Sequence, residues 1–164
     1  MRQIQTKAGV TGYRHQLDRV RRFLERVEGH HQSDVEFQDI VWSFFQHCWH
    51  LKDWVKHDPL ATESQKESVC RQAYASPLLK ICRDLCNGTK HLNLDQARSG
   101  SGARHAHVTT TIVPGQSSEM DCIIEDGHGK LISGKQLARD CVEEWARILE
   151  SERLATSSGE VCVP

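Results

Sequence analysis

The sequence lacks any long apolar run. No stretch approaches the ~20 consecutive apolar residues that span a bilayer, and the first ten residues, MRQIQTKAGV, contain no apolar signal core. We therefore expect a cytosolic protein with no membrane-spanning segment.

An excess of charge of either sign is also missing. The chain has 21 Lys and Arg residues against 22 Asp and Glu residues. No overall electrostatic field therefore draws it to nucleic acid or to a membrane surface, and any site for an anion must be local.

A length of 164 residues predicts one domain, 1–164, that can bury a core without disulfides or a structural metal.

Closely paired cysteines are absent as well. The seven cysteines are an odd number, and none forms a Cys-x-x-Cys pair. This pattern argues against a disulfide framework and against a thiolate zinc site. Cys82 and Cys86 lie one helical turn apart on an apolar face, so we expect them to behave as small buried hydrophobic residues.

Helical periodicity fills the first half of the chain. Apolar residues recur at helical spacing in YRHQLDRVRRFLERVEG, where Gly29 ends the pattern, and in SDVEFQDIVWSFFQHCWHLKDWVKHD, which Ser33 or Asp34 can cap. A short helix is expected around Lys66–Tyr74. Pro77 suits the first turn of the helix that follows.

The pattern changes after the flexible segment ARSGSGAR. Alternating, β-branched residues over about 104–133 predict a small antiparallel hairpin or a three-stranded meander, and a last amphipathic helix is expected over about 135–153. The sequence thus predicts a mainly α fold, a four-helix up-and-down bundle with this β insertion before the last helix. The helical core would comprise 13–94 and 135–153, and 154–164 would be a loose tail.

One helical segment carries an unusual polar pattern. In ICRDLCNGTKHLNL, Asp84, Asn87 and His91 recur three and then four residues apart, which places them on one face opposite the apolar stripe. Arg83 and Lys90 lie beside them. A solvated face is the ordinary explanation of such a pattern, and a reactive surface is the alternative.

The second predicted helix repeats this spacing with His50, Asp53 and His57. Together with Asp84 and His91, these side chains offer enough nitrogen and oxygen ligands for zinc or a dinuclear site if the two helices face one another. No predicted helix carries the His-Glu-x-x-His or Glu-x-x-His pattern that makes such a site specific. A metal-dependent hydrolase therefore remains an alternative, and we assign neither a metal nor a cofactor.

Three aromatic residues broaden the apolar surface of the same helix: Trp42, Phe45 and Trp49 extend it toward Asp53. A helix that is apolar on more than one side usually buries both sides. The three aromatics predict either an interface with a second copy of the chain or a second contact within the core.

The segment CNGTKH resembles the Asn-x-x-x-His part of the signature of the HEPN superfamily, small helical bundles that include metal-independent ribonucleases and non-catalytic relatives. In that family an Arg precedes the polar residue, and the site forms where the bundles of two subunits meet. Asn87 and His91 match the polar and His positions, but Cys86 stands at the Arg position. Arg83, one turn earlier, could bring a guanidinium to the same face.

The resemblance implies a definite chemistry. His91 would transfer protons during attack by an RNA 2′-hydroxyl, and Arg83 or Lys90 would stabilise charge on the phosphate. Asn87 would orient the imidazole or a phosphate oxygen, and Asp84 would fix Arg83. The resemblance also implies a homodimer, RNA as ligand and, in a toxin or defence system, a protein partner such as an antitoxin. A non-catalytic dimerisation or interaction module of the same fold is the alternative.

Overall fold

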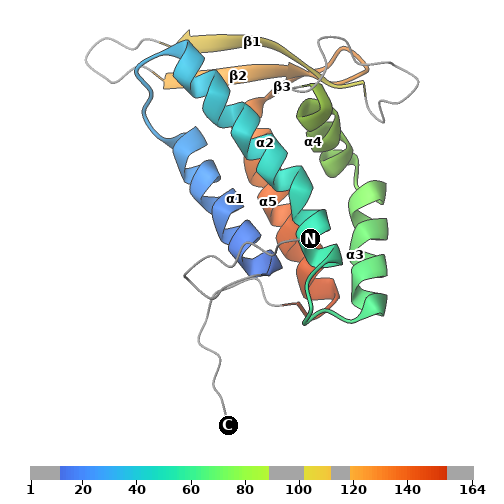
Figure 1. Cartoon of the computed structure of the whole chain (residues 1–164). Helices are drawn as coiled ribbons and strands as arrows, with labels where there is room; N and C mark the ends of the chain where they lie inside the picture. The colour runs from blue at the N-terminus through green and yellow to red at the C-terminus, as the bar shows by residue number, and fades with distance from the viewer. Residues whose placement is uncertain (1–11, 89–101, 112–118, 155–164) are drawn as a thin grey trace.

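The computed structural model of the chain describes residues 12–88, 102–111 and 119–154. These ranges form five helices and one three-stranded antiparallel sheet (Figure 1): α1 (Tyr13–Glu28), α2 (Asp34–Lys56), α3 (Glu63–Ala75), α4 (Pro77–Gly88), β1 (Arg104–Thr111), β2 (Glu119–Glu125), β3 (Leu131–Ser133) and α5 (Gly134–Ser151). The predicted mainly helical chain with a small antiparallel sheet before the last helix is confirmed.

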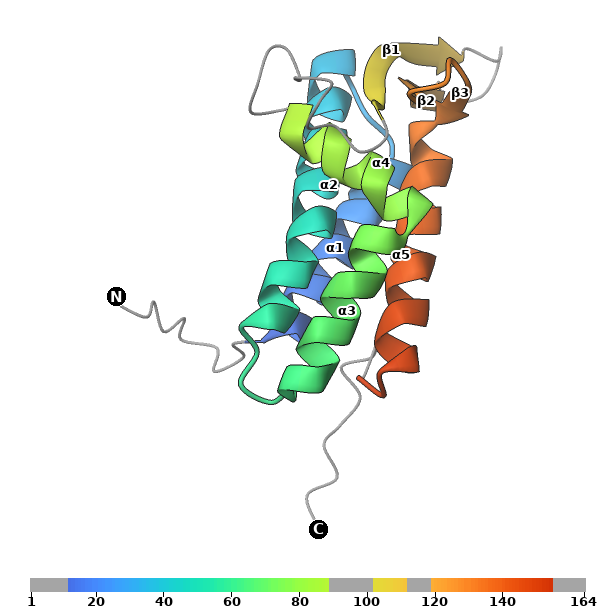
Figure 2. The ribbon, with the colours of Figure 1, turned by 90° about the vertical axis from the view of Figure 1, so that its right-hand side faces the viewer.

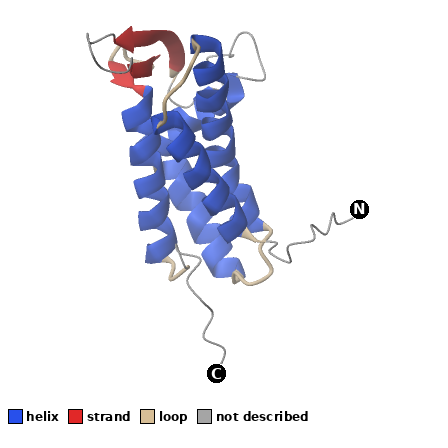
Figure 3. Ribbon diagram, turned by 90° about the vertical axis from the view of Figure 1, so that its left-hand side faces the viewer, coloured by secondary structure: helices blue, strands red, loops and turns tan. Residues whose placement is uncertain are grey.

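The long helices α1, α2 and α5 run side by side. Helices α3 and α4 follow one another along the remaining side, where both contact α2 and α5 (Figures 1 and 2). The sheet, in the order β1-β2-β3, lies across one end of the helices, next to the start of α5 (Figure 3). Among the described helices, none combines the length and the apolar character needed to cross a membrane.

Local capping signals explain where two of the helices begin. Ser33 caps α2 as predicted, because its Oγ accepts a hydrogen bond from the Glu36 backbone N at 3.2 Å. Thr62 and Gln65 form a reciprocal capping box at the start of α3, which therefore begins before the predicted Lys66.

The junction between the sheet and α5 is tied by one carboxylate. Asp121 in β2 accepts hydrogen bonds from the backbone N of Cys122 at 2.8 Å and of Lys135 at 3.1 Å, and Ser133 Oγ also donates to it. A Cβ at Gly134 would overlap the Cys122 sulfur, so only glycine allows the first turn of α5 to lie this close to β2. This junction fixes the direction in which α5 enters the core.

A single buried cluster joins side chains from all five helices and from β2. Residues that are apolar on one helical face meet there, as the sequence periodicity predicts. Among the largest fully buried side chains are Trp145, Phe37, Phe44, Phe45, Leu17, Leu51, Leu79, Leu85, Ile124, Ile148 and Leu149.

Candidate functional site

Helix α4 carries the described part of the predicted working face. Asn87 is half-buried in the last turn, and Arg83 exposes 19% of its side chain. Lys90 and His91, which follow the end of α4 in the sequence, lie outside the described residues.

Asp84 does not face solvent as the helical pattern predicted; it is fully buried. Its Oδ2 accepts a hydrogen bond from the backbone N of Gly102 at 3.0 Å, and its Oδ1 accepts one from Arg83 Nε at 3.3 Å. The expectation failed because the chain that leads into β1 covers this side of α4. Asp84 therefore anchors that segment to α4.

Arg83 is held between a carboxylate and an aromatic ring. Besides its ion pair with Asp84, its guanidinium carbon lies 6.0 Å from the centre of the Trp49 ring. The prediction that Asp84 fixes Arg83 agrees with this geometry. The buried carboxylate partly neutralises the charge that Arg83 could offer to a phosphate.

Of the polar face of α2, His50 contacts α4, but it does so at the buried Cys86 of the apolar face, with Nε2 and Sγ 3.9 Å apart. Asp53 is instead paired with Lys52 at 2.6 Å, and His57 is exposed at the end of α2. Within the described ranges, His50, Asp53, His57 and Asp84 do not come together as a set of metal ligands. The contact between His50 and α4 therefore does not involve Asp84 or Asn87, the described members of the α4 polar face.

The predicted aromatic surface of α2 is covered largely from within the chain. Phe45 is fully buried, and Trp49, only 6% exposed, packs edge-to-face against Tyr74 of α3 with ring centres 5.3 Å apart. Trp42 is partly buried against the core. The second core contact that the sequence left open is therefore made by α3 and α4, and burial of Phe45 and Trp49 does not require a second copy.

A groove of about 600 Å³ lies between α2 and the end of α4. It is lined by Asp39, Trp42, Ser43, Gln46 and Gly88. An indole, a hydroxyl, an amide and a carboxylate thus face one open space, a combination suited to a planar polar ring.

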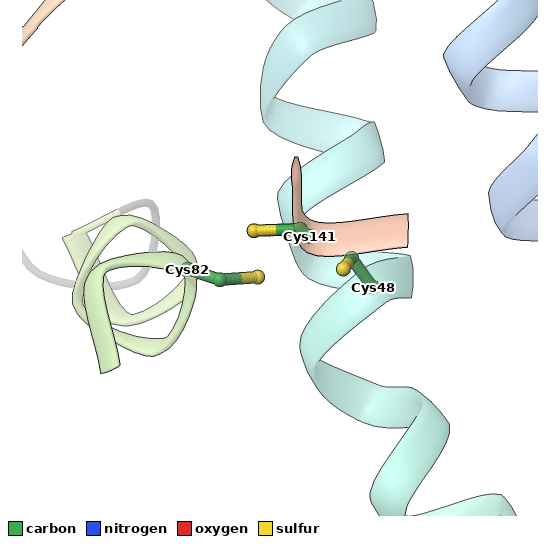
Figure 4. Close-up of side chains that lie close together, drawn as sticks. All are labelled: Cys48, Cys82 and Cys141. Atoms are coloured by element: carbon green, nitrogen blue, oxygen red, sulfur yellow. The ribbon is translucent and has the colours of Figure 1, made fainter. Parts of the chain in front are cut away.

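The sequence pattern missed a cluster of three cysteines. Cys48 of α2, Cys82 of α4 and Cys141 of α5 are all buried, and their sulfur atoms lie within 4.8 Å of one another (Figure 4). The only signal was that the apolar stripe of each of these helices contains a cysteine. The expected burial of Cys82 and Cys86 as reduced thiols is confirmed.

The groups around this cluster are mainly donors and backbone carbonyls. The thiol of Cys82 donates to the carbonyl of Phe45 at 3.5 Å, and that of Cys141 donates to the carbonyl of Leu78 at 3.9 Å. The indole Nε1 of Trp145 is buried and has no hydrogen-bond partner among the described residues.

The three thiols differ in acidity. Burial opposes ionisation of Cys48, but interactions with the neighbouring Cys141 and Cys82 thiols favour its thiolate and lower its pKa to about 5. Burial and the neighbouring thiols raise the pKa of Cys82 well above its usual range, and the interaction with Cys48 does the same for Cys141. Negative charge in the cluster is therefore favoured on the Cys48 sulfur.

No protein-family model, curated protein or solved structure matches the chain. Its function must follow from its own residues.

Two places in the described structure combine enough chemistry to act on a ligand. The groove offers an aromatic face with polar groups beside the end of the α4 motif. The cysteine cluster offers three soft sulfur donors inside the core. None of the groove's lining residues belongs to the cluster.

Proposed function

We propose that this chain is a cytosolic, HEPN-like RNA-acting domain that cleaves RNA without a metal ion or cofactor. Its bundle would be the four-helix up-and-down type, with α3 and α4 together taking one helix position. The resemblance further implies a homodimer with the site between subunits. The observation that carries the proposal is the groove that Gly88 of α4 lines together with α2.

The groove has the chemistry to hold an RNA base. The Trp42 ring can stack on a base, an interaction worth about 1–3 kcal/mol in single-stranded complexes. Gln46 can hydrogen-bond to base edges, and Ser43 Oγ, which donates its proton to the Asp39 carbonyl at 2.8 Å, can accept from them. The Asp39 carboxylate can accept a hydrogen bond from an exocyclic amino group. A base, rather than a phosphate, is the group that suits an acidic wall.

The reacting groups would come from the motif at the end of α4. His91 follows Gly88 by three residues, so covalent geometry keeps the two Cα atoms within about 11 Å. His91 would accept the proton of the attacking 2′-hydroxyl, and Lys90 would stabilise charge on the phosphate. Asn87 would orient the imidazole or a phosphate oxygen.

Arg83 and Asp84 would have supporting roles in this mechanism. The ion pair between them holds the guanidinium in place, with Asp84 fully buried. Cys86 stands where the family has its Arg, so Arg83, one turn earlier on α4, would take the place of that Arg. Its distance from a phosphate would decide whether it or Lys90 gives the larger contribution.

The test is cleavage of a labelled single-stranded RNA by the full chain in excess EDTA. Replacing His91 with Ala should lower the rate by about 10²–10⁴-fold, because the proton-transfer group is lost. His57→Ala is the matched control, since it removes an exposed histidine from the end of α2 and should cleave normally. The products should carry a cyclic phosphate.

Two outcomes would reject this mechanism. One is a His91→Ala variant that cleaves at the wild-type rate; the other is an activity that EDTA abolishes, which would favour the metal-dependent alternative.

A non-catalytic interaction module of the same fold is the second candidate. The burial of two residues of the α4 motif favours this candidate: Asp84 and Cys86 are both fully buried, so they pack inside the protein instead of facing a substrate. RNA that binds without being cut, with binding lost in Trp42→Ala and retained in His91→Ala, would support this module over the nuclease.

A further inference from the structure

The three buried cysteines have the geometry of a ligand set. Cys48, Cys82 and Cys141 come from three different helices, and their sulfur atoms lie close together (Figure 4). An atom bonded to all three at about 2.3 Å would hold the sulfur atoms about 4 Å apart in a planar arrangement and about 3.5 Å apart in a pyramidal one. The sulfur separations, at most 4.8 Å, therefore need to close by no more than about 1.3 Å.

Among the described residues, the cluster offers three ligands and no fourth. No histidine or carboxylate belongs to the group within the described residues. The buried polar atom beside it, Trp145 Nε1, has no hydrogen-bond partner in the part of the chain that the structure describes, and as a donor it has no electron pair to give an ion. Structural zinc sites are almost always four-coordinate, so this set suits a soft ion that accepts three sulfur ligands.

Charge decides which soft ion fits best. Three thiolates around Zn²⁺ carry a net charge of minus one, and around Cu⁺ minus two, whereas around a trivalent ion they are neutral. All three cysteines are fully buried, where a net charge without a partner is costly. We infer that Cys48, Cys82 and Cys141 form a binding site for a trivalent, thiophilic metalloid of the arsenite class.

The binding reaction balances without any oxidant or reductant. Arsenous acid, As(OH)₃, loses its three hydroxyl groups as three As–S bonds form, and each thiol supplies the proton that turns one hydroxyl into water. The arsenic stays trivalent, and the products are one neutral three-sulfur complex and three waters. No other co-reactant is needed.

Such a complex would join α2, α4 and α5 at one point. Since the ligand set exists only in the folded chain, binding should stabilise the fold in proportion to the logarithm of ligand concentration. This inference does not depend on the proposed RNA activity, because none of the three cysteines lines the groove.

The experiment uses the full chain, reduced and then freed of reductant, with sodium arsenite as the probe. Cys82→Ala and Cys86→Ala are matched variants, because both remove a fully buried cysteine from α4 one turn apart. Wild type and Cys86→Ala should retain one arsenic per chain after gel filtration and melt at a higher temperature with arsenite. Cys82→Ala should show neither effect.

Intact-mass measurement gives a second readout that does not require a variant to fold. The wild-type complex should have lost three protons per arsenic, as three As–S bonds demand. Three results would overturn the site. They are a wild-type complex that has lost only two protons, wild-type protein with no bound arsenic, and Cys82→Ala protein that retains one arsenic per chain. Parallel titrations with Zn²⁺ and Cu⁺ test the ion: stoichiometric binding of either one without binding of arsenite would overturn the metalloid assignment.

Discussion

At the scale of single residues, Asp84 links two parts of the chain that are distant in sequence. Its buried carboxylate accepts a hydrogen bond from the backbone N of Gly102 and one from Arg83. Removing a buried acceptor leaves both donors without that partner, and the cost is larger than that of losing an exposed ion pair. The Asp84 side chain therefore contributes to stability whether or not the α4 motif is catalytic.

We predict that Asp84→Ala lowers the free energy of unfolding by about 2–4 kcal/mol. Asp84→Asn should cost less, because its amide oxygen can still accept from Gly102. Asp53→Ala is the control: its side chain is 48% exposed, and its pair with Lys52 should contribute less than about 1 kcal/mol. Urea unfolding measures all three, and equal losses for Asp84→Ala and Asp53→Ala would contradict the anchoring role.

His47 gives a residue-scale prediction about pH. It packs against Phe23 with ring centres 4.8 Å apart, and burial, followed by the charge of Arg19 and the nearby His50, lowers its pKa below 6.5. The unfolded chain therefore takes up this proton at a higher pH than the folded chain does. Stability contributed by neutral His47 is complete above pH 6.5 and is lost as the pH falls from there through the folded pKa.

We expect His47→Gln to lose stability less steeply than wild type between about pH 7.5 and pH 5.5. Denaturant unfolding at several pH values measures the slope. His57→Gln, with its exposed side chain at the end of α2, should keep the wild-type slope. An unchanged slope in His47→Gln would show that this imidazole does not contribute.

At the scale of elements, the contact between β2 and α5 is set by volume. A Cβ at Gly134 would overlap the Cys122 sulfur and lie 3.0 Å from the Cys122 carbonyl oxygen. Gly134→Ala should therefore destabilise the fold by about 1–3 kcal/mol through overpacking.

The double variant Gly134→Ala/Cys122→Ala should be less destabilised than the sum of the two single variants. Cys122→Ala alone leaves a small cavity, and the new methyl group occupies part of that space. Urea unfolding of wild type, the two single variants and the double variant gives the four free energies of this double-mutant cycle. Strictly additive losses would mean that the two side chains do not compete for the same volume.

The elements themselves follow from local sequence, and their mutual contacts do not. Periodicity predicted α1, α2, α5 and the small antiparallel sheet, because the apolar spacing is local. The start of α3 was also available in the sequence as the Thr62–Gln65 capping box. The burial of Asp84 could not be predicted from local sequence, since it depends on contact with the segment before β1.

The candidate sites show the same division between local and long-range information. The Asn87 and His91 spacing could be found in one segment, although His91 lies outside the described residues. The cysteine cluster could not be found in this way, because Cys48, Cys82 and Cys141 occupy three helices. The positions of these helices along one another are set by tertiary packing. The sequence correctly predicted that Trp49 needs a second packing contact, but it did not indicate that α3 provides this contact.

At the scale of the whole molecule, α2 is the element that both candidate sites share. It supplies four of the groove-lining residues, and Cys48, which meets the sulfurs of α4 and α5, belongs to it as well. Helices α3 and α4 cover its aromatic residues Phe45 and Trp49 from one side. Any homodimer must therefore use surface other than those two side chains, and the rim of the groove around Trp42 is the surface next to the proposed RNA site.

The last prediction tests whether the RNA site needs two chains. If it forms between subunits, cleavage per chain should fall steeply once the protein is diluted below its dimer dissociation constant, because the population of dimers falls with concentration. Excess His91→Ala chain added to dilute wild type should then lower the rate, since most wild-type chains would be paired with a subunit that lacks the proton-transfer group. Excess His57→Ala chain is the control and should raise the rate, because it brings intact motifs into the same dimers. A rate that stays proportional to wild-type concentration and does not respond to His91→Ala would mean that each chain acts alone, and the site would then have to be completed by α2 and α4 of a single bundle.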